Sequence, residues 1–452
     1  MKNLFQRITS EANFLSLSGN LTISFFGFAG FALLARSFPI EKFGEWVLFI
    51  SSIVFVEMFR LGITNTAIVR YLSGAGYDER LKIIGSNGLI TLVATCGIAI
   101  ILWTCHLFFS EPIKSAGYEL FFAWYPLLAF INLPYNNALV ILQADQRFDK
   151  ILFIRSFESV TFFLILLLNF LFLKMTLVQL VIVQLIINVF TSTICIINGW
   201  DGFRYLSRAT KKTTKLLLDF GKYTTFTLIG TNLLRSADTL IISLSPLGTA
   251  AVALYSIPMK LTEIQQIPLR SFVATAFPKM SKASGLGNTD EVKDLFYSYS
   301  GAMTYLFVII SLVTFVFAEF FVSLLGGSQY LVTDPVTGFN TVAIMRVFSI
   351  YGLLLPIDRM TGISLDSINK PGKNFIKVCF MVTTNIIGDL IAVYIFKSLL
   401  LVAIASILFT IIGVWVGFYF LDNELQLDKF RLFSSGLEFY KSMYQKFKNR
   451  GS

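Results

Sequence analysis

The sequence predicts an all-α protein that crosses a membrane many times. Hydrophobic residues make up 55% of its 452 residues and charged residues only 14%, whereas soluble domains carry about a quarter charged residues. The mean hydropathy, +0.71, is correspondingly high. Apolar stretches of roughly 20 residues, the length of a helix that crosses a bilayer, recur along the chain. Because backbone groups in lipid must find partners within the protein, these stretches are predicted to be helices.

Twelve spans are predicted, joined by polar connections too short to hold a soluble domain. They cover about residues 15–36, 44–64, 83–109, 119–143, 151–173, 177–200, 218–242, 249–275, 296–319, 340–364, 374–396 and 398–421. We expect two six-helix bundles related by a pseudo-twofold axis along the membrane normal. The predicted domains are an N-terminal bundle (1–200), a basic cytoplasmic linker (201–217), a C-terminal bundle (218–421) and a cytoplasmic amphipathic tail helix (422–452).

Two local matches indicate that the bundles are repeats. Residues 43–46 align with 252–255, and Leu133-Pro134 aligns with Leu355-Pro356. Helix breakers accompany these matches, and we expect each to interrupt its helix: they are Pro134, Pro258, Pro268 and Pro356. Broken helices often border the substrate path of a transporter, although kinking for packing explains them equally well.

The distribution of Lys and Arg predicts the direction of each span. Alternate connections and both terminal segments hold most of the cations, and the opposite connections hold only five, namely Arg36, Lys42, Lys114, Lys174 and Lys397. Cation-rich connections face the cytoplasm, so both termini are predicted to be cytoplasmic. The net charge of +10 is therefore attributed to these connections rather than to a nucleic-acid partner.

Aromatic residues predict contacts with the membrane surface. Trp46, Trp103, Trp124 and Trp200 fall toward predicted span ends, as interface anchors do. In the tail, apolar residues recur at spacings of three and four, with lysines off that stripe; the stripe is Phe430, Phe433, Leu437, Tyr440, Tyr444 and Phe447. This pattern favours a basic helix lying on the anionic inner leaflet, and the alternative is a helix packed on the bundle.

Ionisable residues inside the spans are the most informative feature of the sequence. At the bilayer centre each costs roughly 2.5–3.5 kcal/mol, so these side chains must face the protein interior or a wet cavity. Four sets lie three residues apart, on one helix face, where the two charges can also simply neutralise each other. These sets are Glu57/Arg60, Arg155/Glu158, Arg235/Asp238 and Lys260/Glu263.

Local pairing leaves a surplus of cations inside the spans. Arg270 and Arg346 have no acid at helical spacing, and Asp358 is expected to pair with its neighbour Arg359. Arginine binds phosphate bidentately, so we predict a cationic cavity for an acidic head group. The predicted substrate-binding residues are Arg60, Arg235, Lys260, Arg270, Arg346, Arg359, Asn136 and Asn137, with Asn65, Asn232 and Gln265 as further polar neighbours.

The sequence argues against an enzyme and predicts no cofactor or metal. His106 is the only histidine, so catalytic triads and zinc sites lack residues. The four cysteines lie in apolar stretches without metal-ligand spacing, and no P-loop is present. The longest predicted outer loop, about residues 319–340, is small for a catalytic domain.

Two stretches near the N-terminus, LARSFPIEKFGEWVLF and RLGITNTAIVRYLSGA, resemble the start of bacterial polysaccharide flippases of the Wzx type, and LQADQRFDK is similar to a helix-end signature of that family. These flippases belong to the multidrug/oligosaccharidyl-lipid/polysaccharide exporter superfamily. The resemblance implies a V-shaped pair of six-helix bundles in the bacterial inner membrane. It also implies movement of undecaprenyl-diphosphate-linked oligosaccharide by alternating access, possible partners being other polysaccharide-assembly membrane proteins.

Three alternatives within and outside this superfamily remain open at the level of sequence. Drug exporters often carry a carboxylate in helix 1, which residues 15–36 lack, and lipid II flippases usually have fourteen spans. Both departures favour the O-antigen or capsule-unit class, and a cation-coupled drug antiporter is the second reading. A non-transporting scaffold for glycan assembly is the third reading. Candidates for a proton or sodium site are Asp238, Glu263, Asp358 and Asp389.

Overall fold

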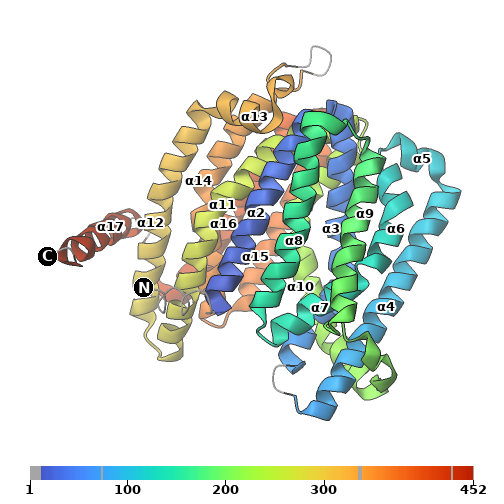
Figure 1. Cartoon of the computed structure of the whole chain (residues 1–452). Coiled ribbons are helices and arrows are strands. Elements are labelled where there is room, and N and C mark those ends of the chain that lie inside the picture. Colours follow the sequence, from blue (N-terminus) through green and yellow to red (C-terminus); the bar gives the residue numbers. More distant parts are fainter. Residues whose placement is uncertain (1–11, 73–74, 334–337, 429–430, 451–452) are drawn as a thin grey trace. The chain divides into compact units, whose positions relative to one another are not determined.

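The computed structural model describes residues 12–72, 75–333, 338–428 and 431–450, and it describes only the backbone of 12–21, 63, 222–235, 443–444 and 446–450. Over these ranges the chain is helical and contains no strand, so the predicted fold class is confirmed (Figure 1). The α-helices are α2 (Ala12–Ser37), α3 (Ile40–Leu72), α4 (Tyr77–Phe108), α5 (Ser110–Ser115), α6 (Glu119–Ile131), α7 (Leu133–Ala144), α8 (Phe148–Leu168), α9 (Leu177–Ile197), α10 (Lys211–Ser243), α11 (Gly248–Gly285), α12 (Thr289–Val316), α13 (Ala318–Gly326), α14 (Thr341–Ser367), α15 (Pro371–Leu390), α16 (Leu399–Leu425) and α17 (Arg431–Arg450). Short π and 3-10 segments are η1 (Asn169–Leu173), η2 (Phe203–Arg208), η3 (Ser328–Tyr330) and η4 (Ile391–Ile395).

Many of these helices are suited to a membrane. Among the described residues, seven helices are long and apolar enough to cross a bilayer, or up to nine if each of two bent pairs is one span. The chain is therefore a multi-pass membrane protein. The predicted number of twelve spans stays a prediction, because α10 and α11 carry more polar and charged residues than this criterion allows.

The chain divides into two compact units. The first comprises Met1–Asn232 with Gly248–Ala250, and the second comprises Leu233–Leu247 with Ala251–Ser452. The division falls inside α10, which runs without interruption from Lys211 to Ser243.

In the first unit, the basic segment after α9 packs closely on α4. A Cβ atom at Gly85 would run into the carbonyl oxygen of Tyr205, and one at Gly88 would lie 3.2 Å from the Leu206 side chain. Only glycine permits this approach of η2 to a helix surface. The hydroxyl groups of Ser86 and Thr213 also share a hydrogen bond of 2.5 Å.

Only one of the predicted proline breaks is observed. α6 and α7 meet at an angle of 51°, and Pro134 stands in the first turn of α7, where its missing N–H costs nothing. Expectations for the other three prolines were wrong, since α14 continues through Pro356 and α11 continues through Pro258 and Pro268. Neighbouring helices compensate for the freed carbonyls of such prolines in membrane proteins.

Two helices end in the same unusual way, one in each unit. α8 passes into the π-helical turn η1, followed by Lys174 with φ +48°, and Thr176 then caps α9. α15 passes into the π-helical turn η4, followed by Lys397 with φ +50°, and Ser398 then caps α16. A left-handed lysine is uncommon, so the shared sequence of turns makes Lys174 and Lys397 local counterparts.

In the second unit, α17 packs on α12 (Figure 1). This contact does not exclude a position on the inner leaflet, so the placement of the tail relative to the membrane stays a prediction. The helices cross at Gly301 and Gly436, where a Cβ on Gly301 would lie 2.8 Å from Gly436 Cα. The Tyr440 hydroxyl donates to the Ala302 carbonyl at 2.8 Å. Phe433 and Leu437 of the predicted stripe stay exposed, whereas Phe430 lies outside the described residues.

The predicted interface anchors are not all alike. Trp46 is buried and stacks on Phe162 with ring centroids 6.1 Å apart, so its assignment to the membrane interface was wrong. Trp46 stands in the second turn of α3, with its ring inside the first unit. Trp103 is exposed, as expected of an anchor, and Trp200 lies beneath the Lys150 ammonium group at 4.6 Å.

Candidate functional site

Arg60 is held in a buried network rather than in an open cavity. Its side chain is 0% exposed, and Nη2 lies 2.7 Å from Glu57 Oε2, as the spacing of three predicted. Nη1 donates to Thr95 Oγ1 at 2.9 Å and to the Ala129 carbonyl at 3.4 Å. The Tyr125 hydroxyl donates to Glu57 Oε1 at 3.0 Å. These groups satisfy both charges inside the first unit, so Arg60 presents no guanidinium face to a ligand in this conformation.

The remaining predicted cations are more accessible. Lys260 pairs with Glu263 at 2.8 Å, again as the spacing predicted, and both side chains are about one-third exposed. Arg346 lies 3.3 Å from Glu319, an acid from α13 that helical spacing could not indicate. Arg270 and Arg359 are exposed. The side chain of Arg235 lies outside the described residues, as does that of Asn232.

Two expected ion pairs, Arg155/Glu158 and Asp358/Arg359, are not formed. Among the described residues, Arg155 forms no ion pair with Glu158; the carboxylate of Glu158 instead accepts hydrogen bonds from the Tyr135 hydroxyl at 2.7 Å and from Gln184 Nε2 at 3.4 Å. The hydrogen-bond donors to the Glu158 carboxylate are thus neutral side chains from α7 and α9. Spacing along one helix does not reveal such contacts between helices.

Asp358 also has a different partner from the one expected. Lys377 of α15 lies 2.7 Å from Asp358 Oδ1, and its ammonium group also donates to the Asp358 carbonyl at 2.6 Å and to Thr361 Oγ1 at 3.2 Å. Consecutive helical residues point in different directions, so Arg359 faces outward while Asp358 is buried. Lys377 lies in the first turns of α15, close to a cation-rich connection, yet only 3% of its side chain is exposed.

Two of the predicted amide residues form hydrogen bonds inside the protein. Asn137 is buried and accepts hydrogen bonds from Asn87 Nδ2 at 3.1 Å and from Thr91 Oγ1 at 3.2 Å. Gln265 is buried and donates to Thr314 Oγ1 at 2.8 Å. Asn65 and Asn136 are half-buried.

The second unit contains a cluster of two buried carboxylates joined by one amide. Asn385 Nδ2 donates to Asp238 Oδ1 at 3.1 Å and to Asp389 Oδ2 at 2.8 Å. The two oxygens are therefore at most about 6 Å apart. The Tyr255 hydroxyl donates to Asp238 Oδ2 at 2.5 Å, and Ser406 Oγ lies 3.4 Å from the same oxygen. Helices α10, α11 and α16 each contribute one residue to this cluster, and α15 contributes two.

The electrostatics of this cluster set it apart from the other buried acids. Asp389 and Asn385 are 0% exposed and Asp238 is 6% exposed. No lysine or arginine whose side chain the structure describes forms an ion pair with either carboxylate, and their partners are neutral. Two negative charges at this distance in a buried site are costly, so the cluster favours uptake of a proton or a small cation. Asp389 Oδ1 is buried and accepts no hydrogen bond within the described part of the chain.

Sequence reasoning named Asp238 and Asp389 but missed the residues that connect them. Asn385 precedes Asp389 by four residues, one helical turn, and this spacing was an available signal. Tyr255 and Ser406 come from other helices, and nothing in their local sequence indicated the contact. Glu263 and Asp358, the other two ion-coupling candidates, each lie next to a lysine.

Comparison with known proteins gives a family match and several fold matches. The family described as polysaccharide biosynthesis protein matches residues 11–284. None of the curated proteins matches. An inward closed structure of the lipid II flippase MurJ has a TM-score of 0.71 at 14% identity, covering 96% of this chain and 92% of that one. An inward-facing multidrug resistance MATE family transporter of the MOP superfamily has a TM-score of 0.72 at 15% identity, covering 92% and 99%. A MOP superfamily transporter from Pyrococcus furiosus has a TM-score of 0.59 at 16% identity, covering 91% and 94%. At these identities the structures show a shared fold.

Proposed function

Because the chain belongs to the polysaccharide biosynthesis protein family, we propose that it is a flippase for lipid-linked oligosaccharide. Its cargo would be undecaprenyl-diphosphate-linked repeat units, moved from the cytoplasmic to the outer leaflet of the bacterial inner membrane for O-antigen or capsule-type polysaccharide. The family match over residues 11–284 carries this proposal. The fold shared with the lipid II flippase and with MOP transporters supports it. Such transport needs no covalent chemistry, so we assign no enzymatic step.

Among the predicted cations, the exposed arginines are the better candidates for the diphosphate. Arg270 and Arg359 are exposed on α11 and α14, where a guanidinium group can dock on a phosphate. Arg60 is enclosed by protein partners, so we assign it a structural role. A cell interior negative by 100 mV favours outward movement of each negative charge by about 2.3 kcal/mol.

We further assign ion coupling to the cluster of Asp238, Asn385 and Asp389. A proton or sodium ion that neutralises the two carboxylates would stabilise the packing of α10 against α15, and its release would loosen that packing. Glu263 and Asp358 are weaker candidates because an adjacent lysine already balances each charge.

Reconstituted vesicles test the proposed transport directly. Purified protein is placed in vesicles with a fluorescent lipid-linked oligosaccharide on one leaflet, and a membrane-impermeant glycosidase reports how much reaches the other leaflet. Arg359→Ala should slow translocation at least tenfold without changing the amount of folded protein. Lys397→Ala, another exposed cation of the second unit, serves as the control. Absence of translocation by the wild-type protein would overturn the proposal.

A cation-coupled drug antiporter is the second candidate, because the fold is shared with MATE transporters and the buried acid pair suits cation exchange. The two functions separate in one experiment. An antiporter expressed in a sensitive strain raises tolerance to organic cations and moves no lipid-linked sugar, whereas a flippase restores surface glycan to a strain that lacks its own. A scaffold would restore glycan in the strain yet move nothing in vesicles.

A further inference from the structure

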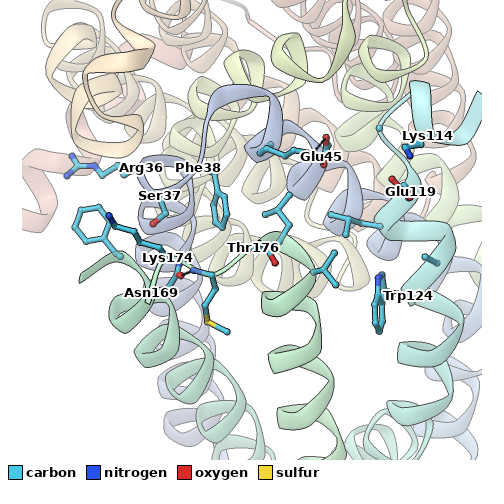
Figure 2. Close-up of a pocket in the computed structure, with 18 residues that line it drawn as sticks. Arg36, Ser37, Phe38, Glu45, Lys114, Glu119, Trp124, Asn169, Lys174 and Thr176 are labelled. Atoms are coloured by element: carbon cyan, nitrogen blue, oxygen red, sulfur yellow. Dashed lines mark hydrogen bonds and ion pairs between the residues drawn. The ribbon is translucent and has the colours of Figure 1, made fainter. Parts of the chain in front are cut away.

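The first unit contains a pocket of about 980 Å³ that no predicted site residue lines (Figure 2). Every residue that lines it belongs to the segment between Arg36 and Val178, so the pocket lies within this unit. Its volume is at the upper end of the range for small-molecule sites, enough for a ligand of several rings.

The charges of this pocket are unusual for this end of the molecule. The sequence places only five cations on the predicted outer side, and four of them line this one pocket: Arg36, Lys42, Lys114 and Lys174. Glu45 and Glu119 are the acids of the lining, so four positive and two negative charges leave a net charge of +2. The fold therefore brings most of the few cations of the predicted outer side together at one pocket.

These four cations come from three separate connections of the chain. Arg36 stands in the last turn of α2, and Lys42 in the first turn of α3, where it pairs with Glu45 at 2.8 Å. Lys114 lies near the end of α5. Lys174 is fixed by the π-helical turn η1 and by its own φ of +48°. Figure 2 shows Arg36 and Lys174 on one side of the pocket and Lys114 with Glu119 on the other.

A buried asparagine and a helix N-terminus form the polar part of the pocket lining. Asn169 is 4% exposed, and its Oδ1 accepts the Met175 N–H at 2.6 Å. Within the described part of the chain no hydrogen bond involves the amide NH2 of Asn169, which is thus available as a donor. α9 begins beside it at Leu177, and the capping box of Thr176 and Gln179 fixes this N-terminus. The positive end of a 21-residue helix therefore adds to the field of the lysines.

Aromatic and apolar surfaces complete the lining. Trp124, Phe38 and Phe170 line the pocket together with the cations and the two carboxylates. Flat aromatic faces pack against the apolar faces of sugar rings, carboxylates accept hydrogen bonds from hydroxyl groups, and ammonium groups bind acidic substituents. An inorganic anion would contact only the ammonium groups and would leave the aromatic faces and the carboxylates unused.

We propose that this pocket binds an acidic oligosaccharide, the sugar portion of the cargo, at the outer end of the first unit. The proposal rests on the proposed function, because it takes the cargo to be a lipid-linked glycan. The pocket inference specifies sugar units that carry carboxylates as the cargo. It also specifies where the sugar portion binds once it has crossed the membrane. Two cationic sides separated across the pocket suit an elongated chain of two or three sugars with more than one acid.

Direct binding to the full chain in lipid nanodiscs tests this inference without any transport step. The probes are trigalacturonate, the neutral trisaccharide maltotriose and inorganic diphosphate, each titrated by calorimetry. Trigalacturonate should bind more tightly than maltotriose, and its affinity should fall as salt is added. The double variant Lys114→Gln/Lys174→Gln should weaken trigalacturonate binding about fivefold or more, since two exposed charge pairs are lost.

The matched control is Lys397→Gln, which alters the local counterpart of Lys174 at a position that does not line the pocket. It should leave trigalacturonate binding unchanged. A second variant, Trp124→Ala, should weaken maltotriose and trigalacturonate alike while leaving diphosphate unaffected.

Three results would overturn the inference. They are equal binding of maltotriose and trigalacturonate, an equal effect of the control and pocket variants, and diphosphate binding that competes fully with the sugar. If the wild-type protein translocates lipid-linked sugar in vesicles yet binds no trigalacturonate, the pocket inference fails and the proposed function stands. If it binds trigalacturonate but translocates nothing, the proposed function fails instead.

Discussion

Replacing Arg60 with methionine should destabilise the first unit, although the sequence alone placed this residue among the substrate ligands. The guanidinium group is fully buried and donates to Glu57, Thr95 and the Ala129 carbonyl. Its loss leaves the Glu57 carboxylate, 20% exposed, with the Tyr125 hydroxyl as its remaining described donor. Removing one member of a buried ion pair costs about 3–5 kcal/mol.

Thermal unfolding of the purified variant, followed by fluorescence in detergent, measures this effect. The double variant Glu57→Gln/Arg60→Met removes both charges and should recover much of the lost stability, because no unpaired charge is left buried. Arg359→Ala is the comparison, since an exposed arginine should change the unfolding temperature little. A stable Arg60→Met protein that binds cargo poorly would refute this reasoning and return Arg60 to the ligand set.

Three further predictions follow from the second unit. Lys377→Met should lower the unfolding temperature, because the Asp358 carboxylate is then buried without its partner. Adding Asp358→Asn should restore part of the lost unfolding temperature. Asp389→Asn should abolish the dependence of vesicle transport on a sodium or proton gradient. The control Asp290→Asn changes an exposed carboxylate and should leave that dependence unchanged. Gradient-dependent transport by the Asp389→Asn protein would contradict the assignment of the coupling site. Gly301→Leu should displace α17 from α12, since no side chain fits at their crossing, and limited proteolysis should then cleave the tail faster; unchanged cleavage would mean that the crossing does not hold the helix.

Local patterns were the reliable part of the sequence. The pairs Glu57/Arg60 and Lys260/Glu263 form as their spacing of three indicated, because a helix brings such residues to one face. Arg155 and Glu158 have the same spacing and do not pair, because Tyr135 and Gln184 from other helices bind the carboxylate. The all-α membrane class followed from apolar length, which depends on no tertiary contact.

Contacts between helices were beyond the sequence. Lys377 reaches Asp358 from a different helix, and a lysine at the start of a span looks the same whether it faces the cytoplasm or a neighbouring acid. Trp46 likewise sits at a span end yet packs inward on Phe162. The pocket of the first unit escaped notice because its cations are each unremarkable alone, and only the fold brings Arg36 and Lys174 together.

The ion pair of Lys377 with Asp358 has a consequence for the ion coupling proposed for the second unit. The counter-ion of Asp358, the Lys377 ammonium group, belongs to the protein and cannot diffuse away. Asp238 and Asp389, which share the Asn385 amide, have neutral partners among the described side chains. Under the ion coupling proposed above, an ion from the medium would exchange at Asp238 and Asp389 and not at Asp358, so the second unit would combine a fixed charge pair with an exchangeable one.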